Sequence, residues 1–272
     1  MLICHLSDLH VRAPGQLAYR CVDSAAYLQR CVAHIKGLTP LPDAVVVTGD
    51  LTDRGEPEEY EHLLSLLEPL SAPVYVIPGN HDKRALMRSA FASRQYLAQS
   101  DDFIQYTAEI GPLRLIALDP VVAGEGGGEL CRDRLAWLDR QLLHYRSFPV
   151  LIVIASPSVS DGNPLHGRRG TTRRPAVRNL GQPLSERGAR TLRPCPSHDL
   201  APLRRDHRIE LSESGSPVTL DFSPDAEPGF TMEPPGYLLH RWTDSEGITS
   251  YSAVIGDYEG PYPFYPNHLG AG

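Results

Sequence analysis

The chain has 272 residues, 41% of them hydrophobic, which is enough for one large core, and its net charge is −7. No stretch approaches the roughly 18 apolar residues of a membrane-spanning helix, no secretory leader pattern begins the chain, and the negative charge argues against a nucleic-acid binder. Five cysteines without a C-x-x-C pair indicate neither a disulfide framework nor a structural zinc site. We therefore expect a single globular unit, residues 1–272, in a reducing cytoplasm and without a membrane partner.

Short apolar runs alternate with segments of helical spacing in the first half of the chain. The expected strands are Leu2–Ser7, Ala44–Thr48, Val74–Pro78, Leu113–Leu118 and Val150–Ile154, and the expected helices are Val22–Leu38, Pro57–Leu67 and Arg132–Leu143. Such alternation predicts a layered α/β domain. In such sheets, ligand-binding groups collect in loops at the carboxyl ends of strands.

Three polar motifs follow three of these strands: D-x-H at residues 8–10, G-D-x-x-D-R at 49–54 and G-N-H-D at 79–82. Residues i and i+2 of an extended segment point to one side, so Asp8 and His10 can reach one ion. Asp50 has two carboxylate oxygens that can bridge two ions, and Asn80 offers a neutral oxygen. Mixed oxygen and imidazole ligands suit Fe, Mn, Co or Zn. Two such ions about 3.5–4 Å apart can clamp a phosphoryl group and activate a hydroxide, and His81 can contact the phosphate or protonate the leaving oxygen.

Each motif also has a purely structural interpretation. A single D-x-H string is common by chance, and Gly49-Asp50 is as often a turn after a strand. Gly79-Asn80 is itself a strong turn dipeptide, and His81 alone is typical of a solvated loop. The joint occurrence in this order, each after a strand, favours the metal site.

The motif set resembles the calcineurin-like metallophosphoesterases, and within them the bacterial class III cyclic-nucleotide and glycerophosphodiester phosphodiesterases. The resemblance continues through residues 42–47 and 57–60 and resumes at about 220–240. It implies a four-layer αββα sandwich, a dinuclear centre of Fe, Mn, Zn or Co, and hydrolysis of small phosphodiesters. By the same resemblance Asp8 and His10 would hold the first metal, Asp50 would bridge and Asn80 would hold the second. Asn80 and His81 would bind substrate, and His81 would be catalytic.

Two further motifs of the resembled family are missing. The family has H-H-P-P after a fifth strand and G-H-x-H after a sixth, and neither string occurs in this chain. After Val150–Ile154 the chain instead reads A-S-P-S, residues 155–158. Three expected histidine ligands are therefore absent, and the sequence as written predicts an impaired enzyme.

The region without these histidines has an unusual composition. Residues 160–208 contain eleven arginines and four acidic residues, a charge of 11 − 4 = +7, so the remainder carries −7 − 7 = −14. No aromatic residue lies between Phe148 and Phe222. A segment with so few large apolar side chains buries too little surface to offset the entropy cost of ordering. We divide the chain into a motif-bearing half, 1–154, an atypical irregular segment, 155–217, and C-terminal strands and tail, 218–272.

The genetic code offers an explanation for the missing ligands. Ala155-Ser156-Pro157-Ser158 can be encoded GCA TCA CCC TCC, and reading one base later gives His-His-Pro-Pro. The same shift turns residues 192–197, as CTG CGG CCA TGT CCA TCG, into Cys-Gly-His-Val-His-Arg. With 24 arginines to two lysines the gene is expected to be GC-rich, and shifted GC-rich codons yield Arg, Pro and Gly. We infer that residues 155–217 are translated out of frame.

Two alternatives remain open from the sequence. One is a non-catalytic remnant that binds one metal or a phosphate compound. The other is a genuine Arg-rich insertion that binds an acidic partner or nucleic acid, although no aromatic residue is interleaved for base stacking. The C-terminal part predicts a hairpin of Tyr237–Trp242 and Ile248–Ile255, and its aromatic tail, by the family resemblance, implies a homo-oligomer.

The frame hypothesis predicts the DNA sequence. Sequencing the gene across codons 150 to 220 should show bases that encode His-His-Pro-Pro and Gly-His-x-His in the neighbouring frame. Codons that give no such histidines in that frame would contradict the hypothesis and favour a genuine insertion.

Overall fold

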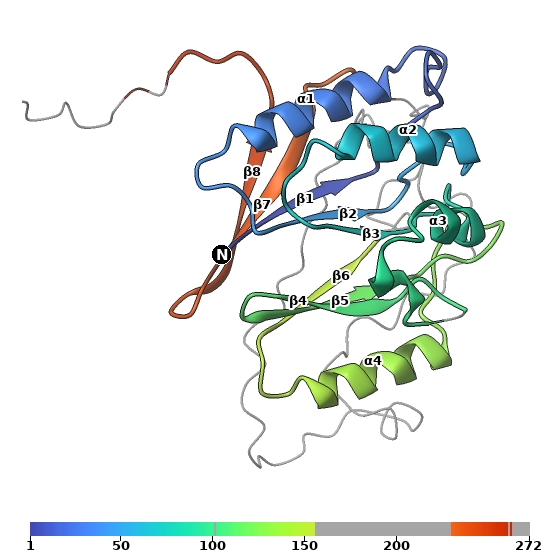
Figure 1. Cartoon of the computed structure of the whole chain (residues 1–272), viewed down its shortest axis with the longest axis vertical. Coiled ribbons are helices and arrows are strands. Elements are labelled where there is room, and N and C mark those ends of the chain that lie inside the picture. The colour runs from blue at the N-terminus through green and yellow to red at the C-terminus, as the bar shows by residue number, and fades with distance from the viewer. Residues whose placement is uncertain (101, 156–229, 261, 263–272) are drawn as a thin grey trace, which may run out of the picture.

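In the computed structural model, two β-sheets pack face to face between helices (Figure 1). The structure describes residues 1–100, 102–155, 230–260 and 262. The first sheet has the strand order β3-β2-β1-β7-β8 and the second β4-β5-β6. Helices α1 and α2 cover the outer face of the first sheet and α4 covers the outer face of the second, so the four layers are αββα, as the sequence predicts.

The strands and helices have the following bounds. The strands are β1 Leu2–Ser7, β2 Ala44–Thr48, β3 Val74–Ile77, β4 Tyr106–Ile110, β5 Leu113–Leu118, β6 Val150–Ile154, β7 Gly236–Thr243 and β8 Gly247–Val254. The helices are α1 Ser24–Lys36, α2 Pro57–Leu67, α3 Arg84–Ala90 and α4 Arg132–His144, with a 3₁₀ turn at Gln95–Ala98. None of the helices described is both long and apolar enough to cross a bilayer.

The three strands that precede the polar motifs lie side by side in one direction. β1 pairs in parallel with β2, and β2 pairs in parallel with β3. Every residue of β2 is buried, because helices cover one face of the sheet and the second sheet covers the other. A continuous apolar run such as Ala44–Val47 is what a strand buried on both faces requires. The carboxyl ends of the three strands therefore meet at one edge of the sheet.

The second sheet divides its side chains between two cores. Leu115 and Ala117 of β5 belong to the main cluster that lies between the sheets. Ile116 and Leu118 instead pack with Leu138 of α4 in a smaller cluster. This alternation follows from the two-residue period of a strand, which sends neighbouring side chains to opposite faces.

Most expected elements are confirmed, and the differences occur at their ends. α1 begins at Ser24, because the side chain of Asp23 accepts a hydrogen bond from the amide of Ala26, 2.9 Å away, as an N-cap does. The C-terminal hairpin is present, one residue longer at each end of its first strand than expected. The sequence analysis missed β4 and α3, whose short polar-interrupted runs carry a weak periodic signal. The irregular segment 155–217 lies outside the described residues except for Ala155.

One buried ion pair ties α3 to the second sheet. Asp119, directly after β5, is fully buried and accepts two hydrogen bonds from Arg84, from Nε at 2.6 Å and from Nη2 at 2.8 Å. Its carboxylate also accepts from the amides of Ile104 and Val121. Bidentate pairing with further hydrogen bonds compensates the desolvation of both charges. The loop that follows β3 is thereby fixed against the second sheet.

Two histidines lie buried within the first sheet. His5 Nδ1 of β1 is 3.3 Å from His240 Nε2 of β7, His5 Nε2 is 2.7 Å from Thr48 Oγ1, and His240 Nδ1 is 2.8 Å from Ser250 Oγ. Burial lowers the pKa of His5 to about 3 and that of His240 to about 4, and the proximity of the rings adds to the effect at His5. Both rings are therefore neutral in the folded protein at neutral pH.

This pair predicts a loss of stability in acid. The unfolded histidines titrate near 6.5, so below this pH the unfolded state binds more protons, and the stabilisation present above 6.5 is lost as the pH falls towards 4. Urea unfolding at about pH 7.5 and about pH 5 should show a loss of about 4 kcal/mol from the two groups. The variant His240→Gln should lose roughly half as much, whereas the control His144→Gln, on an exposed part of α4, should behave as the parent. Equal losses in all three proteins would contradict the assignment.

Candidate metal centre

The three polar motifs meet at the carboxyl edge of the first sheet. Asp8 follows β1, Asp50 follows β2 and Asn80 follows β3. The amide of His10 donates to the carbonyl of Asp50 at 2.8 Å, so the first two loops run side by side beyond the sheet. The expected juxtaposition of these loops is therefore present in the structure.

Three of the expected ligands have a strained backbone. Asp8, His10 and Asp50 have φ values of 52°, 43° and 29°, in the left-handed region that few residues other than glycine adopt. Such a conformation costs on the order of 1–3 kcal/mol for each residue and persists where the surrounding structure imposes it. Its concentration on the residues that the sequence singled out is typical of a functional site.

Gly79 allows the third loop to approach the second. A Cβ atom at this position would overlap the backbone nitrogen and the carboxylate of Asp50. The close approach lets the amide of His81 donate to Asp50 Oδ1 at 2.8 Å. The loop after β3 is therefore oriented by the same carboxylate that the sequence assigned as the bridging ligand.

Asp82 also holds the loop after β2 and the loop after β3 together. Its buried carboxylate accepts hydrogen bonds from three backbone amides and two hydroxyl groups; the donors are Leu51 N, Thr52 N, Gly79 N, Thr52 Oγ1 and Tyr60 Oη, at 2.9 to 3.2 Å. Burial raises the pKa of Asp82 to about 6, and the hydrogen bonds from the Gly79 and Leu51 amides act in the opposite direction. The sequence analysis gave this residue no role, although it is the last residue of the G-N-H-D motif.

Two overlapping groups of side chains have the spacing of a metal site. Ligand atoms of Asp8, His10 and Asp50 lie within 4.8 Å of one another, and so do those of His10, Asp53 and His81. His10 belongs to both groups, with Nε2 at 3.6 Å from Asp50 Oδ2 and Nδ1 at 3.7 Å from Asp53 Oδ1. Two carboxylates and one imidazole are a donor set that suits a divalent transition metal. The first group therefore fits one metal ion.

The two histidines of the site have opposite pKa shifts. Burial lowers the pKa of His10, an effect that the charge of Asp50 only partly offsets. Burial also acts to lower the pKa of His81, but the charge of Asp50 and the hydrogen bond to Asp53 outweigh it, so the pKa of His81 is raised. The rings stand edge to face with centroids 4.7 Å apart. A neutral His10 suits a metal ligand, and a more basic His81 suits a proton donor or a phosphate contact.

An aromatic pair lies on one side of His10. The ring of Tyr19 is 5.9 Å from the ring of His10 and 5.3 Å from that of Phe230, both measured between centroids. Phe230 belongs to the segment that leads into β7, so the C-terminal part of the chain reaches the site. Sequence reasoning missed Tyr19, because a tyrosine outside any motif carries no local signal.

The residue that follows β6 also faces this edge. A Cβ atom placed on Gly49 would be 3.5 Å from the Ala155 methyl group and 3.5 Å from Asp8 Oδ1. Ala155 is buried and holds the position at which the expected H-H-P-P motif would begin. A methyl group offers no ligand atom there.

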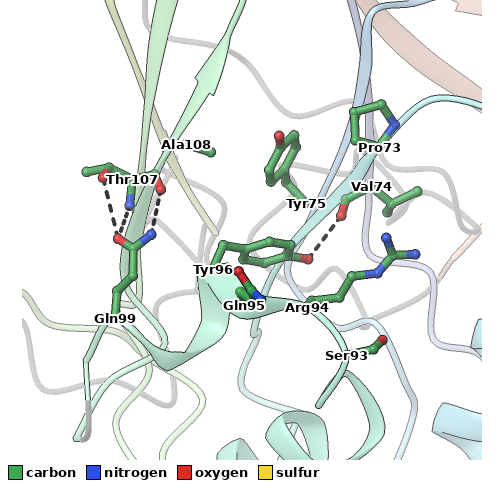
Figure 2. Close-up of a pocket in the computed structure, with 10 residues that line it drawn as sticks. All are labelled: Pro73, Val74, Tyr75, Ser93, Arg94, Gln95, Tyr96, Gln99, Thr107 and Ala108. Atoms are coloured by element: carbon green, nitrogen blue, oxygen red, sulfur yellow. Dashed lines mark hydrogen bonds between the residues drawn. The ribbon is translucent and has the colours of Figure 1, made fainter.

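A separate pocket lies at the other end of β3. Figure 2 shows it between the start of that strand, the 3₁₀ turn and β4, with Tyr75, Tyr96 and Arg94 among the side chains that line it. The Tyr96 hydroxyl donates to the carbonyl of Val74, the first residue of β3, whereas Asn80 follows the last. The pocket is therefore not part of the candidate metal centre.

The close approach of the two loops at Gly79 predicts that a methyl group added at this residue weakens metal binding strongly. Gly79→Ala should push the loops after β2 and β3 apart, break the His81–Asp50 contact and lower the affinity for Co²⁺ by at least about tenfold. The affinity is measured by spectral titration, with Gly126→Ala, where a Cβ would meet no atom within 4 Å, as the control. Unchanged affinity in Gly79→Ala would show that the loops do not need this approach.

Several known proteins are similar to this chain in sequence. A protein of Arcobacter nitrofigilis named a probable glycerophosphodiester phosphodiesterase is 35% identical over 97% of this chain and 97% of its own length. A glycerophosphodiester phosphodiesterase of Enterobacter lignolyticus is 30% identical over 99% of this chain and 96% of its own. A probable cyclic nucleotide phosphodiesterase of Rhodococcus erythropolis is 36% identical over 52% of this chain and 46% of its own.

The family comparison covers the half of the chain that carries the three motifs. The family model described as calcineurin-like phosphoesterase matches residues 1–179, which include all of β1 to β6 and the loops after β1, β2 and β3. With the αββα layers and the Asp8, His10 and Asp50 group already in place, this match shows that the chain belongs to the calcineurin-like phosphoesterase family.

Proposed function

We propose that this protein is built as a metal-dependent phosphodiesterase that hydrolyses small phosphodiesters, either 3',5'-cyclic nucleotides or glycerophosphodiesters. The observation that carries the proposal is the convergence of Asp8, His10 and Asp50 within 4.8 Å at the carboxyl edge of the sheet. The relatives named glycerophosphodiester and cyclic nucleotide phosphodiesterases support the choice of a diester. The same names leave both classes of substrate in the proposal.

The motif residues would have distinct roles in metal and substrate binding. Asp8, His10 and Asp50 would hold one ion, and Asp50 and Asn80 would contribute to a second. Ions of the Fe, Mn, Zn or Co type would compensate charge on the phosphoryl group and lower the pKa of a water nucleophile. Asn80 would orient the substrate through its amide.

His81 would act on the substrate through its outer ring nitrogen. Its Nδ1 is 2.7 Å from the carbonyl oxygen of Asp53 and donates to it, which leaves Nε2 to face the site. Because its pKa is raised, the ring carries a proton more readily than an ordinary histidine. It can then donate to a phosphate oxygen or to the leaving oxygen.

We further propose that the chain as written is impaired, because residues 155–217 are out of frame. Of the second-ion ligands that the family resemblance implies, only Asp50 and Asn80 lie among the described residues, and Ala155 stands where the expected histidine motif would begin. The relative from Arcobacter aligns over 97% of this chain and 97% of its own length, so the alignment spans this segment and both of its flanks. An alignment of this extent is what a frame shift followed by a restored frame would leave, because neither step adds a long insertion.

We also propose that the protein works in the cytoplasm, as one domain over residues 1–272, and as a homo-oligomer. Its partner would be a small phosphodiester and not a membrane or a nucleic acid. The alternatives are a non-catalytic protein that binds one ion or phosphate, favoured by the incomplete second ligand set, and an Arg-rich interaction protein.

The proposal is tested by comparing the chain as written with a frame-corrected chain. The corrected protein should contain two metal ions by mass spectrometry and hydrolyse bis(p-nitrophenyl) phosphate, whereas the chain as written should hold at most one ion and be at least about 100-fold slower. In the corrected protein Asp8→Asn should abolish most of the activity and Asp244→Asn, in the exposed β7–β8 turn, should not.

Three results would contradict parts of this proposal. Two tightly bound ions and normal turnover in the chain as written would refute the impairment. A corrected chain that binds one ion and hydrolyses no diester would favour the non-catalytic alternative. Salt-dependent retention on nucleic acid by the chain as written would favour the Arg-rich interaction protein.

A further inference from the structure

One ring nitrogen of His10 lacks a hydrogen bond to any of the described residues. Nδ1 of His10 is buried and without a hydrogen-bond partner, and Asp53 Oδ1 lies 3.7 Å from it. A metal-binding imidazole directs its second ring nitrogen to a carboxylate, a carbonyl or water, which fixes the tautomer and the ring orientation. Among the described side chains, Asp53 is placed to receive the Nδ1–H of His10.

The carboxylate of Asp53 is held in place from its other side. Arg12 Nη1 donates to Asp53 Oδ2 at 3.1 Å, and the backbone amide of Asp53 donates to the carbonyl of Val11 at 3.2 Å. Arg12 is itself buried, and its Nη2 donates to Gln16 at 2.5 Å. The second oxygen of Asp53 is thereby left facing His10.

Glu59 anchors this arrangement on helix α2. It is 1% exposed, and its Oε1 accepts from Arg12 Nη1 at 2.7 Å. Its Oε2 accepts from the backbone amides of Arg54 and Glu56. Buried charges of opposite sign with satisfied hydrogen bonds hold their geometry well, because breaking any contact leaves an uncompensated charge.

We propose that Glu59, Arg12 and Asp53 form a relay that keeps the proton of His10 on Nδ1 and thereby presents the Nε2 lone pair towards Asp8 and Asp50. These are positioning residues, which act on a metal ion through His10. The inference rests on the proposed function, since it gives His10 an ion to bind. A lone pair on Nδ1 would face the Asp53 carboxylate with no donor between them. Nε2 lies 3.6 Å from Asp50 Oδ2, so the two carboxylates compete for the ring proton, and the proposal assigns it to Asp53.

The two histidines of the site interact differently with Asp53. His81 hydrogen-bonds to the backbone carbonyl of Asp53, and a ring nitrogen of His81 also lies within 4.8 Å of the Asp53 carboxylate, whereas Nδ1 of His10 lies 3.7 Å from that carboxylate. A change to the side chain of Asp53 should therefore alter His10 while it leaves the hydrogen bond of His81 in place. The hydrogen bond of His81 to the Asp53 carbonyl, and the tautomer that it sets, therefore serve as an internal control.

Replacing Asp53 with asparagine should invert the tautomer of His10. Arg12 has only donors, so it requires the amide oxygen of the new side chain. The amide nitrogen would then face His10 Nδ1 and donate to it, which moves the imidazole proton to Nε2. The shape of the side chain is retained, so the substitution tests the direction of the hydrogen bond more than the packing.

The first readout is the tautomer of His10 in the metal-free protein, measured from isotope-labelled ring nitrogens by NMR. The parent should carry the proton on Nδ1, Asp53→Asn should carry it on Nε2, and the neutral form of His81 should keep its proton on Nδ1 in both, because its acceptor is the backbone carbonyl. The matched control is Arg54→Gln, which removes a charge near Asp53 from an exposed side chain. It should leave His10 as in the parent.

The second readout is Co²⁺ affinity by spectral titration. Asp53→Asn should weaken binding by about 10- to 100-fold, the range for residues that orient a metal ligand. The double variant Arg12→Gln/Glu59→Gln, which removes the two buried charges together, should also weaken it. Arg54→Gln should bind as the parent does.

Two results would overturn the relay. One is an unchanged tautomer of His10 in Asp53→Asn. The other is weaker binding in Asp53→Asn with full affinity in the double variant, which would make Asp53 a direct ligand. If the parent binds no Co²⁺, the proposed metal function fails and the tautomer measurement alone decides the relay.

Discussion

The buried carboxylate of Asp82 is the constraint on which the site depends. It gathers five hydrogen-bond donors, most of them from the loops after β2 and β3. A buried charge is stable only when it is fully hydrogen-bonded, so the two loops cannot separate without a large cost in free energy. This fixed distance brings the amide of His81 to Asp50. The geometry of the candidate metal group therefore depends on Asp82, which is not itself a member of that group.

A rigid sheet makes this arrangement possible. β1, β2 and β3 are parallel and almost wholly buried, so their carboxyl ends form a fixed edge. The ion pair of Arg84 with Asp119 extends this rigidity to the second sheet, and α3 then fixes the loop that carries His81. The strained backbone of Asp8, His10 and Asp50 is sustained by these surroundings.

The charged groups around the site fall into two layers. The first layer is the candidate metal group of Asp8, His10 and Asp50, whose ligand atoms lie within 4.8 Å of one another. The second layer is the set of ion pairs that Arg12 makes with Asp53 and Glu59. This second layer has a net charge of +1 − 2 = −1, because one guanidinium lies between two carboxylates. Its ion pairs hold the Asp53 carboxylate beside His10, which is the orienting role that the relay assigns to it.

The sequence by itself determined the strands, the three motifs and the edge of the sheet at which they meet, because apolar periodicity and motif order are local properties. It also predicted the αββα layers through the family resemblance. It gave no role to Asp82, Arg12 and Glu59, and it missed Tyr19, β4 and α3. Their importance comes from contacts between segments far apart in the chain, such as Tyr19 with Phe230 and Arg84 with Asp119. Only the tertiary structure decided these, since hydrogen-bond direction and burial arise when the loops are packed together.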